Sequence, residues 1–422
     1  MQTNLAEFLR QTPDGDEAEA ILRKCVHCGF CTATCPTYQL LGDELDGPRG
    51  RIYLIKQMVE GQSVTRETQR HLDRCLTCRS CESTCPSGVQ YGRLADIGRR
   101  HIDAKVGRPA RERAVRWTLA HVLPNRTLFS PALRLGQQFR GLLPRALREK
   151  VPHRQRSGSW PQTKHTRRML MLEGCVQPSM LPNVNKATAR VLDALGIEML
   201  RPSSAGCCGA IRLHLNYHDD GLDDIRRNID AWWPEIEAGA EAIVINASGC
   251  GATVKEYGHL LRHDSQYAGK AQRVSELAKD LSEILLDNLE ALQKRVPNHK
   301  NSKNGKAGKI AYHPPCTLQH GQQLKGVVEK VLAGVGVSVM LPQDSHICCG
   351  SAGTYSVTQP ELSHQLRDAK WKSLDALDPE LVVSANVGCI CHLQATAKGE
   401  HARDHAPVQH WVELLDRMIA SA

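Results

Sequence analysis

Two short cysteine runs near the start of the chain limit its fold more than any other feature. They read Cys25-Val-His-Cys-Gly-Phe-Cys-Thr-Ala-Thr-Cys-Pro36 and Cys75-Leu-Thr-Cys-Arg-Ser-Cys-Glu-Ser-Thr-Cys-Pro86. Both have the spacing C-x2-C-x2-C-x3-C-P, and they begin 50 residues apart. The first three thiolates of such a run can surround one face of a cubane iron–sulfur cluster, and the fourth, followed by proline, reaches a different cluster. The sequence therefore predicts two [4Fe–4S] clusters with crossed ligands.

The crossed arrangement assigns each of the eight cysteines to one cluster. We assign Cys25, Cys28, Cys31 and Cys85 to the first cluster, and Cys75, Cys78, Cys81 and Cys35 to the second. The alternative is a pair of structural zinc sites, which usually have C-x2-C pairs separated by a longer loop. Two complete four-cysteine runs favour clusters over zinc.

Composition and cysteine usage restrict the class of protein. A chain of 422 residues is long enough for about two to three domains. Its 17 cysteines, an odd number in short motifs, suit metal ligation in a reducing compartment better than a disulfide framework. No apolar run approaches the ~18 residues of a membrane span, and residues 1–10 lack the apolar core of a signal peptide. We expect a cytoplasmic protein, or one bound peripherally to the cytosolic face of the inner membrane.

Residues 1–105 are predicted to form an α-helical ferredoxin-type domain. Residues 16–24 begin with acidic and end with basic side chains, as a helix dipole favours. Further helices are expected at about 47–60, 65–74 and 90–105. Because the spacer between the two cysteine runs is helical in pattern, we expect a helical module rather than a β-hairpin one. Arg49 and Arg51 in this spacer can either tune a cluster through hydrogen bonds or simply solvate the start of a helix.

Residues 106–167 are predicted to form a basic helical connector and linker. From Arg99 to Arg168 there are 18 lysines and arginines against 3 acidic residues, a net charge of +15. This segment is interpreted as a helical hairpin with a solvated basic face, or as a surface that contacts anionic lipid or an acidic partner. A nucleic-acid partner is not expected, because no recognised binding module accompanies the charge.

The second half of the chain is a repeat of alternating strands and helices. Strands are expected at 168–172, 197–200 and 242–246, and again at 309–313, 337–341 and 381–384. Each copy contains a Cys-Cys-Gly triplet, and a single cysteine precedes the triplet by 32 residues in both. We therefore expect two small parallel-sheet α/β domains, 168–295 and 308–422, separated by a mobile loop at 296–308. The predicted fold class is α plus α/β.

Each copy places its cysteines just after strands, where open α/β sheets bind their ligands. The candidate ligands are Cys175, Cys207, Cys208 and Cys250 in the first copy, and Cys316, Cys348, Cys349, Cys389 and Cys391 in the second, with His313 and His392 nearby. These residues are interpreted either as further cluster or metal sites or as buried free thiols.

These motifs together carry a family resemblance. Twin ferredoxin runs followed by two Cys-Cys-Gly domains resemble the heterodisulfide-reductase-like iron–sulfur subunits. The stretches Leu22-Arg-Lys-Cys-Val-His-Cys-Gly-Phe-Cys, Gly42-Asp-Glu-Leu-Asp-Gly-Pro-Arg-Gly-Arg, Met171-Leu-Glu-Gly-Cys and Cys349-Gly-Ser-Ala-Gly-Thr-Tyr are most similar to the glycolate oxidase (glycolate dehydrogenase) iron–sulfur subunits. Relatives with an unusual cluster in the Cys-Cys-Gly domains close the site with C-x2-C. Here the corresponding stretches are Cys250-Gly-Ala-Thr253 and Cys389-Ile-Cys391, which depart from that pattern.

The resemblance implies the electron-transfer subunit of an oxidoreductase. Partner subunits containing FAD would oxidise glycolate to glyoxylate, and this chain would pass the electrons to quinone or another membrane acceptor. No Gly-x-Gly-x-x-Gly fingerprint follows a predicted strand, so we expect no flavin on this chain and no catalytic residue for hydride transfer. The alternatives are the equivalent subunit of a lactate or glycerol-3-phosphate dehydrogenase, a heterodisulfide or thiol reductase acting at the Cys-Cys-Gly sites, and a structural zinc protein.

Overall fold

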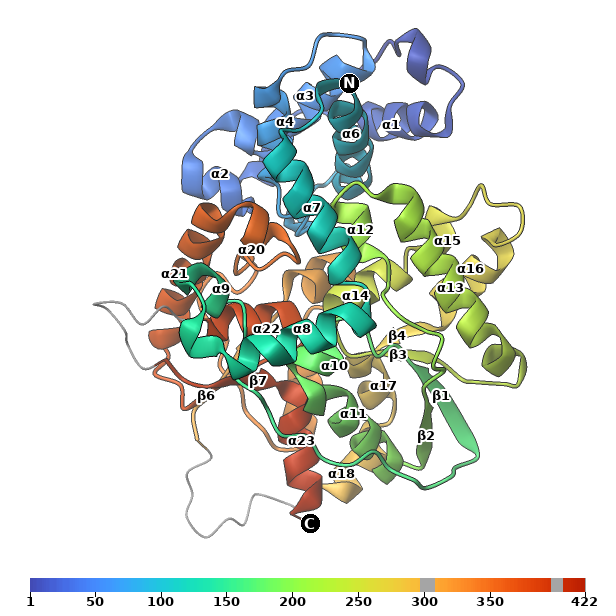
Figure 1. The fold of residues 1–422 in the computed structure, drawn as a ribbon, viewed down its shortest axis with the longest axis vertical. Coiled ribbons are helices and arrows are strands. Elements are labelled where there is room, and N and C mark those ends of the chain that lie inside the picture. Colours follow the sequence, from blue (N-terminus) through green and yellow to red (C-terminus); the bar gives the residue numbers. More distant parts are fainter. Residues whose placement is uncertain (297–307, 396–404, 422) are drawn as a thin grey trace. The chain divides into compact units, whose positions relative to one another are not determined.

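The computed structural model describes residues 1–296, 308–395 and 405–421, and Figure 1 traces its elements along the chain. The loop expected at 296–308 lies outside the described residues except for its two ends. The chain divides into two units. Met1–Trp117 and His346–Lys370 form the first, and Thr118–Ser345 and Trp371–Ala422 form the second.

The first unit is helical in the part that contains the two cysteine runs. The helices that begin in it are η1 (Glu7–Leu9), α1 (Pro13–Lys24), η2 (Phe30–Thr32), α2 (Pro36–Leu41), η3 (Glu44–Asp46), α3 (Pro48–Val59), α4 (Arg66–Asp73), α5 (Ser80–Thr84), α6 (Tyr91–Val106), α7 (Ala110–Val122), α20 (Tyr355–Thr358) and α21 (Pro360–Asp375). Helix α1 begins as its sequence favours, with Thr12 capping the Gly15 amide and Pro13 in the first turn. The expected helical ferredoxin-type region is confirmed.

A core of aliphatic side chains holds these helices together and positions the cysteine runs. Leu22 of α1, Ile55 and Met58 of α3, Leu72 of α4 and Leu94 of α6 are all buried. Helix α1 ends one residue before the first run, and α4 ends two residues before the second run. The packing of the helices therefore fixes where each cysteine run starts.

The second unit contains the first α/β repeat and most of the second. The helices that begin in it are α8 (Arg126–Gln138), η4 (Arg140–Leu142), α9 (Arg145–Arg148), α10 (Gln177–Met180), α11 (Pro182–Ala194), α12 (Ala210–His214), α13 (His218–Glu237), α14 (Ser248–Val254), α15 (Tyr257–Leu260), α16 (Ala268–Leu277), α17 (Leu281–Asp287), α18 (Leu289–Arg295), η6 (Thr317–Gly321), α19 (Val327–Gly334), α22 (Val387–Gln394) and α23 (Trp411–Ala420). Figure 1 shows these helices and the short strands between them in turquoise to red.

Each repeat contains one small parallel sheet, as expected for the fold class. The first sheet has the order β2-β1-β3-β4, and the second has the order β5-β6-β7. Their strands are β1 (Arg167–Met171), β2 (Ile197–Leu200), β3 (Ile243–Ile245), β4 (Ala278–Asp280), β5 (Ile310–His313), β6 (Leu381–Ser384) and β7 (Val408–His410). Central strands such as β3 are fully buried, which explains their continuous apolar sequence.

The structure differs from the sequence expectation at the edges of both sheets. The segment 337–341, expected as a strand, makes only a single parallel bridge between Met340 and Ala311. Strands β4 and β7 were not expected, because each has three residues with a polar residue in the middle. Such short edge strands carry no hydrophobic pattern that distinguishes them from loops.

The carboxyl ends of strands from the two sheets meet inside the second unit. The Ser248 amide, just after β3, donates to the Ala385 carbonyl, just after β6, over 3.1 Å. The His410 side chain at the end of β7 bonds the Asn246 carbonyl at 2.8 Å. The repeats are therefore joined at the strand ends that carry their cysteines.

The basic segment 106–167 contains α7, α8, η4 and α9. Leucine and phenylalanine side chains of α8 and its C-terminal extension are exposed, including Leu135, Phe139 and Leu142. Part of the positive charge of this segment is neutralised by ion pairs, because Arg108 and Arg116 both pair with Asp73. Within the described ranges, no helix has the length and apolar character to cross a bilayer.

Candidate iron–sulfur cluster sites

The two cysteine runs fold into turns of the same unusual backbone shape. His27 and Gly29 in the first run have φ values of 61° and 89°, and Thr77 and Arg79 at the equivalent positions have 52° and 58°. Left-handed backbone at a β-branched residue such as Thr77 is strained and persists only where the surroundings require it. Turns of this kind direct successive amides inward and form a concave site for an anion. The Thr77 amide, for example, donates to the Cys75 sulfur over 3.4 Å.

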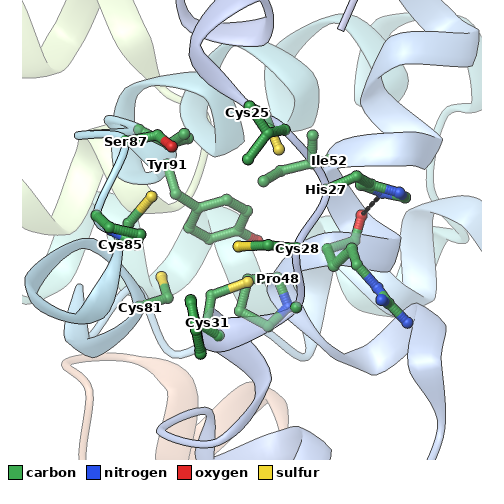
Figure 2. A pocket seen from close by; sticks show the side chains of 16 residues that line it. Cys25, His27, Cys28, Cys31, Pro48, Ile52, Cys81, Cys85, Ser87 and Tyr91 are labelled. Atoms are coloured by element: carbon green, nitrogen blue, oxygen red, sulfur yellow. Dashed lines mark hydrogen bonds between the residues drawn. The ribbon is translucent and has the colours of Figure 1, made fainter.

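The first cavity of the helical region collects cysteines from both runs. Its sulfur-bearing residues are Cys25, Cys28, Cys31, Cys81 and Cys85. Figure 2 shows these five side chains around the ring of Tyr91. The cavity encloses about 440 Å³ including its open mouth, and Cys28 is exposed there. The four cysteines assigned to the first cluster thus lie together. The fifth, Cys81, also lines the second cavity.

The second cavity collects the other four cysteines. Cys35, Cys75, Cys78 and Cys81 line it, together with Arg51 and Tyr91. It encloses about 360 Å³, and three of its cysteines (Cys35, Cys75 and Cys81) are buried. Cys81 and Tyr91 line both cavities, so they lie between the two candidate cluster sites.

Two buried arginines dominate the electrostatics of the second cavity. Burial by itself would raise the pKa of the Cys75 thiol, but the charges of Arg51 and Arg99, together with hydrogen bonds from Tyr91 and Thr77, lower it. Burial raises the pKa of Cys81, and the neighbouring Cys78 and Cys75 add to this effect. A thiolate is therefore favoured at Cys75, where a cluster ligand must be deprotonated.

The first cavity has a different electrostatic environment. Burial raises the pKa of Cys31 to about 11, and the neighbouring Cys25, Cys85 and Cys28 thiolates add to the shift. The nearest arginine of the lining, Arg49, is about one-third exposed and pairs with Glu44 at 2.6 Å. Four thiolates crowded without a buried cation need the positive charge of bound iron to coexist.

Buried hydroxyl donors support a bound group with acceptor atoms. The Tyr91 hydroxyl hydrogen-bonds the Cys75 sulfur, and in the described part of the chain the Ser80 hydroxyl is buried without a hydrogen-bond partner. Burial raises the pKa of Tyr91 strongly, so the phenol stays protonated and remains a donor. Thiolate and sulfide atoms of an iron–sulfur cluster are acceptors of this kind. The cysteine ligands and these buried hydroxyl donors together fit two iron–sulfur clusters.

The first Cys-Cys-Gly repeat brings four sulfurs into a chain of contacts. Cys175 and Cys208 both hydrogen-bond Cys207, and Cys208 also contacts Cys250. These bonds hold the pKa of Cys207 well below its usual value and raise the pKa of Cys175 and Cys208. Cys207 is completely buried, so a low pKa there stabilises a ligand thiolate rather than an accessible nucleophile. All four candidate ligands of this copy are therefore close together.

Two side-chain hydrogen bonds hold the Cys-Cys-Gly turn of the first repeat in place. The Asn228 amide of α13 donates to the Cys207 carbonyl at 2.6 Å, and the Tyr257 hydroxyl donates to the Cys208 carbonyl at 3.0 Å. Gly209 has a φ of 90°, and a Cβ there would lie 2.8 Å from the Gly221 carbonyl oxygen. Only glycine fits this turn, because it needs both left-handed backbone and close contact with α13.

The second repeat distributes its cysteines over both units. Cys348 and Cys349 belong to the first unit, where the Gly350 amide donates to the Cys348 sulfur over 3.4 Å. Cys316, Cys389 and Cys391 belong to the second unit, where the Asn386 amide lies 3.5 Å from the Cys389 sulfur. Burial raises the pKa of Cys391 to about 12, which favours a neutral thiol at that position.

His313 and His392, considered beside these cysteines, are both buried in the second unit. One nitrogen of His313 bonds the Ser384 hydroxyl at 3.1 Å, and the other has no partner among the described residues.

Several residues of these sites were not singled out by the sequence. Tyr91, Arg99 and Asn228 act from helices at a distance along the chain from the cysteines that they contact. Tyr91 is the first residue of α6, the helix after the second run. A large aromatic residue with a polar group at this position was the sequence signal that could have marked it as part of the site. Arg99 and Asn228 look like ordinary helical polar residues in the sequence.

Two protein-family models match this chain. A "4Fe-4S dicluster domain" matches residues 21–89, and a "Cysteine-rich domain" matches twice, at residues 169–255 and 310–394. The matched regions coincide with the helical cluster region and with the two parallel-sheet repeats.

Similar proteins are known over the full length of the chain. It is 53% identical over 420 residues to the glycolate oxidase iron–sulfur subunit of Escherichia coli (strain K12), covering 99% of both chains. It is 30% identical to the probable glycolate oxidase iron–sulfur subunit of Bacillus subtilis (strain 168), covering 95% of this chain and 94% of that one. Lactate utilization protein A of Bacillus pumilus is 29% identical but matches only 57% of this chain. The chain belongs to the family of glycolate oxidase iron–sulfur subunits, the iron–sulfur electron-transfer components of an oxidoreductase.

Proposed function

We propose that this chain carries electrons from FAD-containing partner subunits, which oxidise glycolate to glyoxylate, towards quinone or another membrane acceptor. The full-length likeness to the Escherichia coli glycolate oxidase subunit carries this proposal. The lactate-utilization relatives match little more than half of the chain, so glycolate is favoured over lactate as the partner's substrate. The two thiolate-lined cavities supply the sites that one-electron carriers need.

The proposed cluster ligands follow the crossed assignment. Cys25, Cys28, Cys31 and Cys85 hold one [4Fe–4S] cluster, and Cys75, Cys78, Cys81 and Cys35 hold the other. The lining of the two cavities supports this assignment. When bound, such clusters accept and release one electron at a time. The chain contributes the ligand thiolates, inward-facing amides and a helical core that keeps most of these groups away from water.

The four sulfurs of the first Cys-Cys-Gly repeat are a candidate site for a further cluster or metal ion. Their mutual contacts and burial support ligation by Cys175, Cys207, Cys208 and Cys250. The burial of Cys207 argues against a heterodisulfide reductase, because a disulfide substrate must reach the attacking sulfur. For the second repeat, we propose Cys348 and Cys349 as candidate ligands in the first unit and Cys316 and Cys389 as candidate ligands in the second, and we propose that Cys391 remains a thiol.

The exposed apolar and basic surface of α8 and η4 is a candidate for peripheral membrane contact. Leu128, Leu135, Phe139 and Leu142 are exposed there, next to basic side chains such as Arg134. Amphipathic surfaces of this composition bind anionic membranes. A cytoplasmic protein resting on the inner membrane would stand next to the quinone pool.

The experiment that tests the function compares the complete complex with the partner subunits alone. Glycolate-dependent reduction of quinone and of an artificial dye is measured in both, with lactate and glycerol 3-phosphate as comparison substrates. We expect glycolate-dependent quinone reduction only in the complete complex. Full quinone reduction by the partner subunits alone would overturn the electron-transfer role of this chain. Faster reduction with lactate than with glycolate would show that lactate, not glycolate, is the substrate of the complex.

A further inference from the structure

The two cluster sites of the helical region differ in buried charge. The cavity with Cys35, Cys75, Cys78 and Cys81 is lined by Arg51, whose side chain is 1% exposed. Arg99 of α6 is 8% exposed and donates to the carbonyls of Leu72 and Cys75 and to the Thr77 hydroxyl. Both guanidiniums are therefore fixed beside the second site and shielded from solvent.

Carboxylates offset only part of this charge. Asp46 lies 3.4 Å from Arg51, but it also pairs with Arg74 at 2.7 Å and with His71. Glu82 adds a negative charge near Cys81. Asp96 also acts on Arg99, and Asp73, which acts on it more weakly, is bound by Arg108 and Arg116. Arg79, which lines the second cavity, adds a further positive charge. The surroundings of the second site therefore retain an excess of positive charge.

The described lining residues of the first site include no buried arginine. Its arginine, Arg49, is about one-third exposed and is paired with Glu44. Cys28 is exposed, so solvent reaches this site and screens charges near it. A charge in a site of lower effective dielectric acts roughly fourfold more strongly than the same charge in bulk water.

We propose that Arg51 and Arg99 give the cluster held by Cys35, Cys75, Cys78 and Cys81 a higher reduction potential than the one held by Cys25, Cys28, Cys31 and Cys85. Reduction adds one negative charge to a cluster site, and a fixed cation nearby stabilises that charge. Burial works in the opposite direction, but both cations lie directly at this site: Arg51 lines the cavity and Arg99 donates to the Cys75 carbonyl. One electron entering this region therefore resides on the second site, and the first site stays oxidised. This inference rests on the two-cluster assignment proposed above.

A redox titration of the intact complex, followed by electron paramagnetic resonance, tests the proposal. We expect two midpoint potentials in the wild type. Arg51→Gln should lower the midpoint potential of the second cluster. The equilibrium of one electron between the two clusters should then shift at least tenfold towards the first cluster, which corresponds to about 59 mV. The Arg51→Lys variant keeps the charge and should shift it much less. Asp46→Asn should move the second cluster's midpoint in the opposite direction.

Arg49→Gln is the matched control, because it removes an exposed and paired arginine from the first site. We expect it to leave the midpoint of the second cluster unchanged. Equal shifts for Arg51→Gln and Arg51→Lys, or shifts confined to the first cluster, would overturn the proposal.

A second measurement covers the case in which the Arg51 variants do not fold. Cys28→Ser changes an exposed ligand of the first site, so it should alter the spectrum of the lower-potential centre only. If it alters the higher-potential centre, the inference is wrong although the two-cluster function stands. If the complex contains no iron in this chain, the function itself fails.

Discussion

Cys31 and Cys85 lie in different cysteine runs, 54 residues apart, yet they line the same cavity. We predict that Cys31→Ser and Cys85→Ser each damage the same cluster, whereas Cys35→Ser damages the other. The reason is the crossed ligation, in which the last cysteine of each run serves the partner cluster. Spectra of the three variants, recorded by electron paramagnetic resonance, provide the check. The assignment is wrong if Cys31→Ser and Cys85→Ser affect different clusters.

A buried histidine makes the stability of the second unit depend on pH. Burial lowers the pKa of His410 to about 4, against an ordinary value of 6.5. Its Nε2 donates to the Asn246 carbonyl, and its Nδ1 accepts from the Val412 amide at the start of α23. Between pH 6.5 and 4 the unfolded chain binds a proton at this residue that the folded chain does not. Stability from this residue is therefore present above pH 6.5 and lost as the pH falls, by up to about 3 kcal/mol.

Hydrogen exchange of the α23 amides, corrected for the intrinsic pH dependence of exchange, measures this loss. We expect protection to decrease between pH 7 and 5 in the wild type. His410→Asn keeps an acceptor for the Val412 amide but does not titrate, so its protection should change less over the same range. Identical pH dependence in the two proteins would contradict the prediction.

At the scale of elements, the contact between a Cys-Cys-Gly turn and the second helix after it recurs in both repeats. Gly209 approaches the Gly221 carbonyl of α13 in the second unit, and Gly350 approaches the Ser363 carbonyl of α21 in the first. We predict that Gly209→Ala destabilises the second unit by about 1–3 kcal/mol, because it adds a Cβ against backbone and strains a left-handed residue. The measurement is the urea midpoint of unfolding.

Gly249→Ala is the matched control for this substitution. Gly249 lies in α14, and the nearest atom to a Cβ there is 3.7 Å away, so the change should be tolerated. Equal stability of the Gly209 and Gly249 variants would show that the Cys-Cys-Gly turn does not need its glycine.

At the scale of the whole molecule, the number of iron atoms reports how many sites are filled. Two cubane clusters account for about eight iron atoms per chain, and a further cluster in the first Cys-Cys-Gly repeat raises the count. We predict that Cys207→Ala lowers the iron content to that of two cubanes while the spectra of both ferredoxin-type clusters persist. Iron and sulfide analysis of anaerobically prepared protein is the measurement. A wild-type count of about eight would contradict a further cluster.

The organisation of the molecule into a helical cluster region and two parallel-sheet repeats could be predicted from the sequence. The ferredoxin-type spacing acts within a few residues, and the buried strands carry continuous apolar runs, so both signals are local. The edge strands β4 and β7 could not be predicted, because a strand of three residues with a polar residue in the middle has no such apolar run. The placement of Arg51 was left open, since a buried charge and a solvated one look alike in sequence.

The sequence alone determined that a helical ferredoxin-type region precedes two Cys-Cys-Gly repeats, and it predicts the crossed assignment of the eight cysteines, because both depend on spacing along the chain. Only the tertiary structure decided that Tyr91 stands between the two cavities, that Arg51 and Arg99 are buried beside one of them, and that Cys207 contacts both Cys175 and Cys208. Each of those outcomes depends on how helices and strands distant in sequence pack against one another. Burial and charge environment are properties of that packing.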